Sequence, residues 1–312
     1  MIFLVLTAAA LCCGFVLAGG GARSEFVLTA RIEKITVMIL VAYCVAVSSV
    51  LFQTITHNHI LTPSLLGFDA LFVLVQAVGI LMLGSAFTSG NSTWVFCCNA
   101  VLMAGGAALI FRWFASKHTH DLHVLMLSGV LLAILFKGLT ALVMRMIDPN
   151  DYLLLQDLMF ANFNSSRWDL VPITLLVIVA ATVIIWRMRK DYDVIALGRD
   201  MAVNLGVNHR RVVAWTFLAI ALLVAVATAL VGPLAFLGLL ASNMAYWMIG
   251  SHKHRHTLPA ATGCAVIILV GCQALLERAL GLRLPVTVLI DFLGGLLFLI
   301  LIMKRKSCDR NR

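Results

Sequence analysis

The chain has 312 residues, of which 62% are hydrophobic and only 12% are charged, about half the charged fraction of a typical soluble domain. This composition excludes a soluble enzyme or receptor domain and indicates that the bilayer is the solvent for most of the chain. The net charge of +9 does not indicate nucleic-acid binding, because the cations lie at the ends of apolar runs and not in an aromatic-interleaved patch.

Apolar runs of about 20 residues, the length that spans a bilayer, recur along the whole chain. They predict an all-α polytopic membrane protein with about ten transmembrane helices, forming one domain over residues 1–312. No basic segment precedes the first run, so we expect a retained span and not a cleaved signal peptide. The expected spans are 1–20, 35–54, 65–84, 93–114, 122–146, 168–187, 211–231, 233–250, 258–278 and 287–304.

Two features of this span pattern leave alternatives open. The run broken at Gly232-Pro233 fits either two spans or one span with a half-helix, since neighbours or a cavity must satisfy the freed backbone groups. With ten spans and the N-terminus inside, fifteen Lys and Arg residues lie inside and seven outside. The positive-inside rule therefore favours cytoplasmic N- and C-termini. An odd span count with an external N-terminus is the alternative, because Met1 has no charged flank.

One polar segment, from Trp186 to Arg211, interrupts the apolar runs and carries six Lys and Arg residues. Its charge places it on the cytoplasmic side. Gly198 and Gly206 bracket apolar residues at helical spacing, and a glycine readily ends a turn. The pattern predicts a compact helical element, at about 188–210, that a partner protein moves.

Motifs for nucleotide binding and hydrolysis are missing from the sequence. It contains no G-x-x-x-x-G-K-[ST] phosphate loop, no G-x-S-x-G elbow and no H-E-x-x-H pair, so we expect a transport subunit without its own ATPase site and without a cofactor. If transport is ATP-driven, partner chains must bind the ATP and Mg²⁺.

Histidines and cysteines raise the question of a metal site. In the ten-span topology all nine histidines fall at or near the cytoplasmic face, away from the middle of a transport path. We interpret them as polar loop residues, with a regulatory cytosolic metal site as the alternative. The eight cysteines show no C-x-x-C spacing and are interpreted as small hydrophobic residues. No metal site is expected. The histidines are His57, His59, His118, His120, His123, His209, His252, His254 and His256.

Ionisable residues inside spans are costly and are therefore functional candidates. Lys137 lies within the fifth span, and Arg145 follows two turns later on roughly the same face. Two cations along a path attract an anionic substrate. The alternative is that one of them reaches the interface or pairs with an acid such as Asp291. Glu277 and Asp291, toward the outer ends of their spans, are expected to be structural partners.

At the head of the second span, Arg31 and Lys34 lie one helical turn apart on the outer side. They are candidates for docking an acidic patch of an extracytoplasmic partner, or for anchoring the helix at the interface. Arg283, in another outer loop, is a third candidate for the same docking surface.

Four stretches resemble the FecCD-type family of iron-siderophore and cobalamin ABC importer permeases. Residues 54–67 (TITHNHILTPSLLG) are similar to its T-x-N-P-L-A-x-P-x-x-L-G stretch. Residues 196–206 (ALGRDMAVNLG) resemble its A-L-G-x-x-x-A-x-x-L-G loop. Residues 231–239 (VGPLAFLGL) and 284–295 (LPVTVLIDFLGG) resemble its V-G-P-I-x-F-I-G-L and closing L-P-V-G-x-x-T-x-x-x-G-x-P stretches. The order along the chain is that of the family.

The resemblance implies a type II ABC importer permease in the bacterial cytoplasmic (inner) membrane. Its expected partners are a second permease subunit, identical or not, two cytoplasmic ATPase subunits and an extracytoplasmic siderophore-binding protein. Spans five and ten are implied to border the path, and Arg31 and Lys34 resemble the pair that meets the binding protein. The implied ATPase-coupling residues are Ala196, Leu197, Gly198, Arg199, Asp200, Ala202, Leu205 and Gly206.

Departures from the family pattern narrow the expected substrate. Arg199 stands where an acid is usual, Ser242-Asn243 replaces the usual P-H pair, and Gly295 replaces the closing proline. With residues 67–70 (GFDA) and 147–150 (IDPN), these features resemble the branch that serves catecholate and related siderophores. Ferric tris-catecholates are anionic, which fits Lys137. The expected function is import of a ferric siderophore. The alternatives are a zinc or manganese permease, a cobalamin or heme permease, a proton-coupled secondary transporter and a non-transporting scaffold.

Overall fold

The computed structural model describes residues 2–17, 25–84, 87, 92–117, 122–164, 168–251, 253–279 and 284–309, and within these ranges every regular element is a helix. The α-helices are α1 (Ile2–Leu17), α2 (Glu25–Thr56), α3 (Phe68–Leu83), α5 (Ser92–Lys117), α6 (Leu122–Met144), α7 (Pro149–Leu158), α8 (Val171–Arg187), α9 (Arg189–Ile195), α10 (Arg199–Asn204), α11 (His209–Val231), α12 (Leu237–Ile249), α13 (His254–Ala279) and α14 (Val286–Asp309). Two 3₁₀ helices, η2 (Pro63–Leu66) and η3 (Trp168–Leu170), precede α3 and α8.

Ten of these helices are apolar and correspond to the ten expected spans. In the described part of the chain, five are long and apolar enough to cross a membrane, namely α2, α6, α8 with η3, α11 and α13. Five shorter apolar helices, α1, α3, α5, α12 and α14, complete the set. The prediction of an all-α membrane protein is confirmed for the described residues, and the ten apolar helices are consistent with the ten expected spans.

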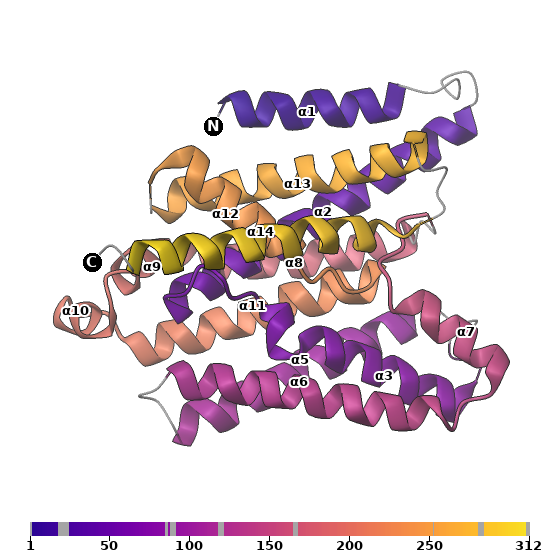
Figure 1. Cartoon of the computed structure of the whole chain (residues 1–312), viewed down its shortest axis with the longest axis horizontal. Helices are drawn as coiled ribbons and strands as arrows, with labels where there is room; N and C mark the ends of the chain where they lie inside the picture. The colour runs from indigo at the N-terminus through magenta and orange to yellow at the C-terminus, as the bar shows by residue number, and fades with distance from the viewer. Residues whose placement is uncertain are drawn as a thin grey trace.

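The apolar helices run roughly side by side along the long axis of the molecule (Figure 1). The start of α1 and the end of α14 lie at the same end of the bundle as α9 and α10, whereas α7 lies at the opposite end (Figure 1). An even number of crossings explains why the chain begins and finishes on one side. We call the end that carries α9 and α10 the coupling end, and the end that carries α7 the outer end, after the positions that the sequence predicts for them.

The apolar run is interrupted after α11 because of the backbone conformation at Gly232. This residue has φ +107°, and a Cβ there would lie 3.0 Å from Phe160 O, so both the backbone and the close approach require glycine. The Asn162 N–H donates to Val231 O at 2.8 Å, which satisfies a carbonyl at the helix end. The chain resumes as α12, whose 13 residues measure about 20 Å. The second half of the broken run is thus a helix much shorter than a full span.

A tight turn precedes α3, which fills most of the span expected over 65–84. Pro63 starts η2, and Gly67 ends it with φ +95°. A Cβ at Gly67 would lie 3.1 Å from the backbone of Ala133 in α6. The start of α3 is therefore held against α6, and this helix has 16 residues, about 24 Å of length.

Burial differs sharply between helices. The most apolar stretches of α2 and α11 are each 72% buried, whereas that of α6 is only 11% buried. Lipid provides no hydrophobic force between helices, so small residues that allow close packing matter most. Gly238 of α12 packs directly on Ser49 of α2, and Gly294 of α14 packs on Phe236. The core is therefore built around α2 and α11, while α6 lies at its edge.

Candidate functional site

The polar segment between α8 and α11 forms two short helices, α9 and α10. Gly198, at φ +107°, precedes α10, and Gly206, at φ +83°, follows it. Sequence reasoning expected a compact helical element bracketed by these glycines, and this is confirmed. The division into two helices was not anticipated.

Residues 196–206, which we call the knob, have one side buried and one side exposed. Ala202 is fully buried, and Ile195 is fully buried just before the knob. Arg199 and Asp200 are exposed. Large apolar side chains also point outward, and exposed apolar groups gathered in one place indicate a binding surface. These side chains are Leu197 (63% exposed), Met201, Val203 and Leu205.

The two candidate path cations lie on or beside α6. Lys137 is exposed on α6, and Arg145 is exposed just after the helix ends at Met144. Exposed apolar side chains, including Ile134 and Leu139, surround Lys137 along the helix. A charge on such a surface is costly in lipid, so this face of α6 requires an aqueous or polar neighbour.

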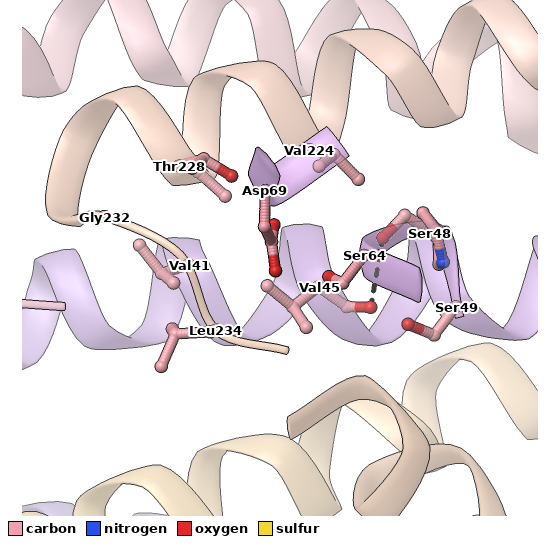
Figure 2. A pocket seen from close by; sticks show the side chains of 12 residues that line it. Val41, Val45, Ser48, Ser49, Ser64, Asp69, Val224, Thr228, Gly232 and Leu234 are labelled. Atoms are coloured by element: carbon pink, nitrogen blue, oxygen red, sulfur yellow. Dashed lines mark hydrogen bonds between the residues drawn. The ribbon is translucent and has the colours of Figure 1, made fainter. Parts of the chain in front are cut away.

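A small pocket lies among α2, η2, the start of α3 and the end of α11, with about 310 Å³ of empty volume including open space. Figure 2 shows the Asp69 side chain between Val45 of α2 and the α11 residues Val224 and Thr228. The Ser64 hydroxyl hydrogen-bonds to the Asp69 carboxylate. The remaining polar lining comes from Ser48, Ser49 and Thr228.

Asp69 is a site residue that the sequence-based reasoning missed, because it treated residues 67–70 only as a feature of a family branch. The signal was present, since an acid within an apolar run is a functional candidate. Its carboxylate is close enough to Lys137 and Asp291 for their charges to act on it. Asp291 accepts a hydrogen bond from the Phe236 backbone N–H, and its Oδ1 is buried without a partner. The turn before α3 and the break after α11 therefore bring acidic groups near the cation of α6.

The candidate docking cations at the outer end are engaged within the chain. Lys34 is 9% exposed, forms an ion pair with Glu277 of α13 and donates to Asn164 Oδ1 at 2.7 Å. Arg31 Nη1 donates to the carbonyls of Phe15 and Val16, each at 3.3 Å, at the end of α1. Arg283 lies outside the described residues.

Metal-binding side chains do not cluster in the part of the chain that the structure describes, where no group of three or more His, Cys, Asp or Glu is placed to hold an ion. His118, His120 and His252 lie outside the described residues.

The bundle of ten apolar helices in the described residues, with one apolar run broken at Gly232 and a helical knob at one end, is that of a polytopic membrane protein. The chain belongs to the FecCD transport family, whose model matches residues 2–304.

Several relatives in this family are named permeases. The petrobactin import system permease protein YclO of Bacillus subtilis is 35% identical, over 98% of each chain. The petrobactin import system permease protein FatC of Bacillus anthracis is 29% identical over 90% of this chain and 80% of that protein. The ferric enterobactin transport system permease protein FepD of Escherichia coli is 29% identical over 92% and 84%.

A solved structure supports the fold independently of close sequence similarity. The structure described as "An inward-facing conformation of a putative metal-chelate type ABC transporter" has a TM-score of 0.83 and 19% identity, and the match covers 97% of this chain and 98% of that one. At this identity the likeness concerns the fold alone.

Proposed function

We propose that this chain is a permease subunit of an ATP-driven importer that carries a ferric siderophore, of the catecholate class, across the bacterial cytoplasmic membrane. The observation that carries the proposal is the exposed apolar knob on a chain of the FecCD family that has no phosphate loop of its own. Full-length similarity to a petrobactin permease supports the substrate class.

The knob is the surface that we assign to an ATPase partner. Its outward apolar side chains and the neighbouring Arg199 and Asp200 offer a mixed apolar and charged contact, the composition of interfaces that form between separate chains. One such contact on each of two permease subunits requires two ATPase subunits. ATP binding and hydrolysis in those partners move the knob and bias the bundle between outward-open and inward-open states.

The face of α6 that carries Lys137 is the part of the path that we assign to this chain. Little of α6 is buried here, so a second permease subunit facing it would enclose a path between the two. Lys137 attracts an anionic chelate, while Asp69 and Asp291 keep the local charge from becoming strongly positive. The described residues form no tight binding cage, so we assign the affinity to an extracytoplasmic binding protein docked at the outer end, at the surface that carries Arg31.

Reconstitution in liposomes tests the proposed function. The chain, its partner permease, ATPase and binding protein are supplied with ⁵⁵Fe-labelled ferric petrobactin or ferric enterobactin. ATP-dependent accumulation of the label is expected. Uptake of zinc, cobalamin or heme in place of the siderophore contradicts the substrate class. Uptake driven by a pH gradient without the ATPase contradicts the ATP-driven mechanism.

Replacing Lys137 with Met tests its place on the path. Lys137→Met is expected to lower uptake of an anionic ferric catecholate about tenfold, the effect of losing about 1.4 kcal/mol of favourable interaction. Uptake of a neutral ferric hydroxamate should fall much less, because that chelate gains little from the charge. Leu139→Met, two residues away on α6 and also exposed, is the matched control. Equal losses for both chelates would show that the lysine is structural.

A further inference from the structure

A buried histidine connects the segment beside the knob to the bundle. His254, the first residue of α13, is only 3% exposed. Its ring Nδ1 lies 2.7 Å from Asp193 Oδ1 in α9, and its Nε2 lies 2.7 Å from Thr54 Oγ1 in α2. One ring therefore bridges α9 and α2, with a hydrogen bond on each nitrogen.

Asp193 makes a second contact that fixes this arrangement. Its Oδ1 also accepts the backbone N–H of His254 at 2.9 Å. A carboxylate in this position satisfies a free N–H at the start of α13 and interacts favourably with the positive end of the helix dipole. A displacement of α9 thus acts on both the backbone and the side chain of His254.

Tyr192, the neighbour of Asp193, joins the same cluster from α9. Its ring lies 5.6 Å from the His254 ring, and its hydroxyl is 3.3 Å from Thr216 Oγ1 of α11. Burial raises the pKa of the Tyr192 phenol. The contact adds α11 to the elements that converge on His254.

The end of α2 that contacts His254 also contacts α12. The Tyr246 hydroxyl of α12 hydrogen-bonds to Thr54, and its ring packs edge-on against His59 at 4.7 Å. One residue before Thr54, Gln53 Nε2 donates to Ser242 Oγ at 2.8 Å. The ends of α2 and α12 nearest the knob are therefore held together by buried polar contacts, which are strong in a low-dielectric interior.

We propose that His254 is a positioning residue that transmits movement of α9 and the knob to the ends of α2 and α12 nearest the knob, so that ATP hydrolysis is converted into opening of the bundle. The inference rests on the proposed function, since it presupposes an ATPase at the knob. His254 itself touches neither substrate nor nucleotide; it acts through Asp193 and Thr54.

The test measures labelled ferric siderophore transported per ATP hydrolysed by the reconstituted complex. His254→Ala is expected to lower this ratio about tenfold, comparable to the loss of one charge-assisted hydrogen bond, while ATP hydrolysis continues. His254→Gln, which keeps one polar end, should recover part of the ratio. His256→Ala is the matched control, because His256 lies two residues away on α13 and is exposed.

Asp193→Asn provides a second variant in case His254→Ala fails to assemble. It keeps an oxygen for the His254 backbone N–H but removes the charge, and it should lower the ratio in the same direction. Asp193→Asn and His254→Ala should not be additive when combined, because both remove one connection. A normal ratio in His254→Ala, or an equal loss in His254→Ala and His254→Gln, overturns the inference alone. A wild-type complex that imports no siderophore overturns the proposed function and this inference together.

Discussion

Valine at Gly198 or Gly206 is expected to reduce siderophore uptake at least about tenfold while leaving the chain inserted in the membrane. Both glycines have φ values that L-residues rarely adopt, +107° and +83°, and forcing another residue into such a region costs about 1–3 kcal/mol. A Cβ at either position would meet no atom within 4 Å. The effect therefore comes from the backbone alone: the strained turn reshapes the knob and disturbs its contact with the ATPase.

The measurement is uptake and ATP hydrolysis in the same liposomes, together with the amount of inserted chain. Gly105→Val is the matched control, because Gly105 also has open space around its Cβ position but no positive φ and lies within α5. Loss of uptake with continued ATP hydrolysis is the expected signature. Normal uptake in both knob variants would contradict the assignment of residues 196–206 as the coupling element.

Removing Glu277 is expected to have the largest effect on stability. Among the described residues, Glu277→Leu leaves the buried Lys34 ammonium with Asn164 as its polar partner, and breaking a buried ion pair in this way costs about 3–5 kcal/mol. Adding Lys34→Met should restore most of the loss, because both charges are then gone. Thermal unfolding of the purified complex measures the difference, with Glu25→Leu at the exposed start of α2 as control.

The same pair of variants decides between two roles for Lys34. If the lysine serves mainly to hold α2 against α13, the double variant binds the extracytoplasmic protein normally. If it docks that protein, Lys34→Met weakens binding whether or not Glu277 is present. The sequence alone left docking and anchoring open, and Arg31 and Arg283 keep their predicted docking role until binding is measured.

Local patterns explain what the sequence predicted correctly. Apolar runs specify spans because each helix satisfies its own backbone in lipid, and the glycines at 198 and 206 mark the ends of turns wherever the surrounding helices lie. The span expected over 65–84 corresponds to α3, which starts three residues later because Gly67 ends η2. The run after Gly232 left two spans or one span with a half-helix open, and the 13 residues of α12 have the length of a half-helix.

Local sequence patterns do not predict which side chains from distant segments pair with each other. Lys34 and Glu277 are 243 residues apart, and no spacing rule connects them. The position of His254 between α9 and α2 depends equally on how α13 packs. Asp69 lies in an apolar run, as Lys137 does, but its importance emerges only when η2 turns it toward α2 and α11.

Polar side-chain contacts join α2 to α13 near both ends, and this limits how the two helices can move relative to each other. Lys34 and Thr54 are 20 residues apart on one helix, about 30 Å, and each contacts a residue of α13, Glu277 at one end and His254 at the other. Two antiparallel helices connected near both ends resist sliding past each other and changes of their crossing angle. We therefore expect α2 and α13 to tilt together as one rigid unit. The large displacements of a transport cycle then fall to elements outside this pair, among them α6, whose apolar stretch is only 11% buried. The Glu277 and His254 variants each remove one of the two connections.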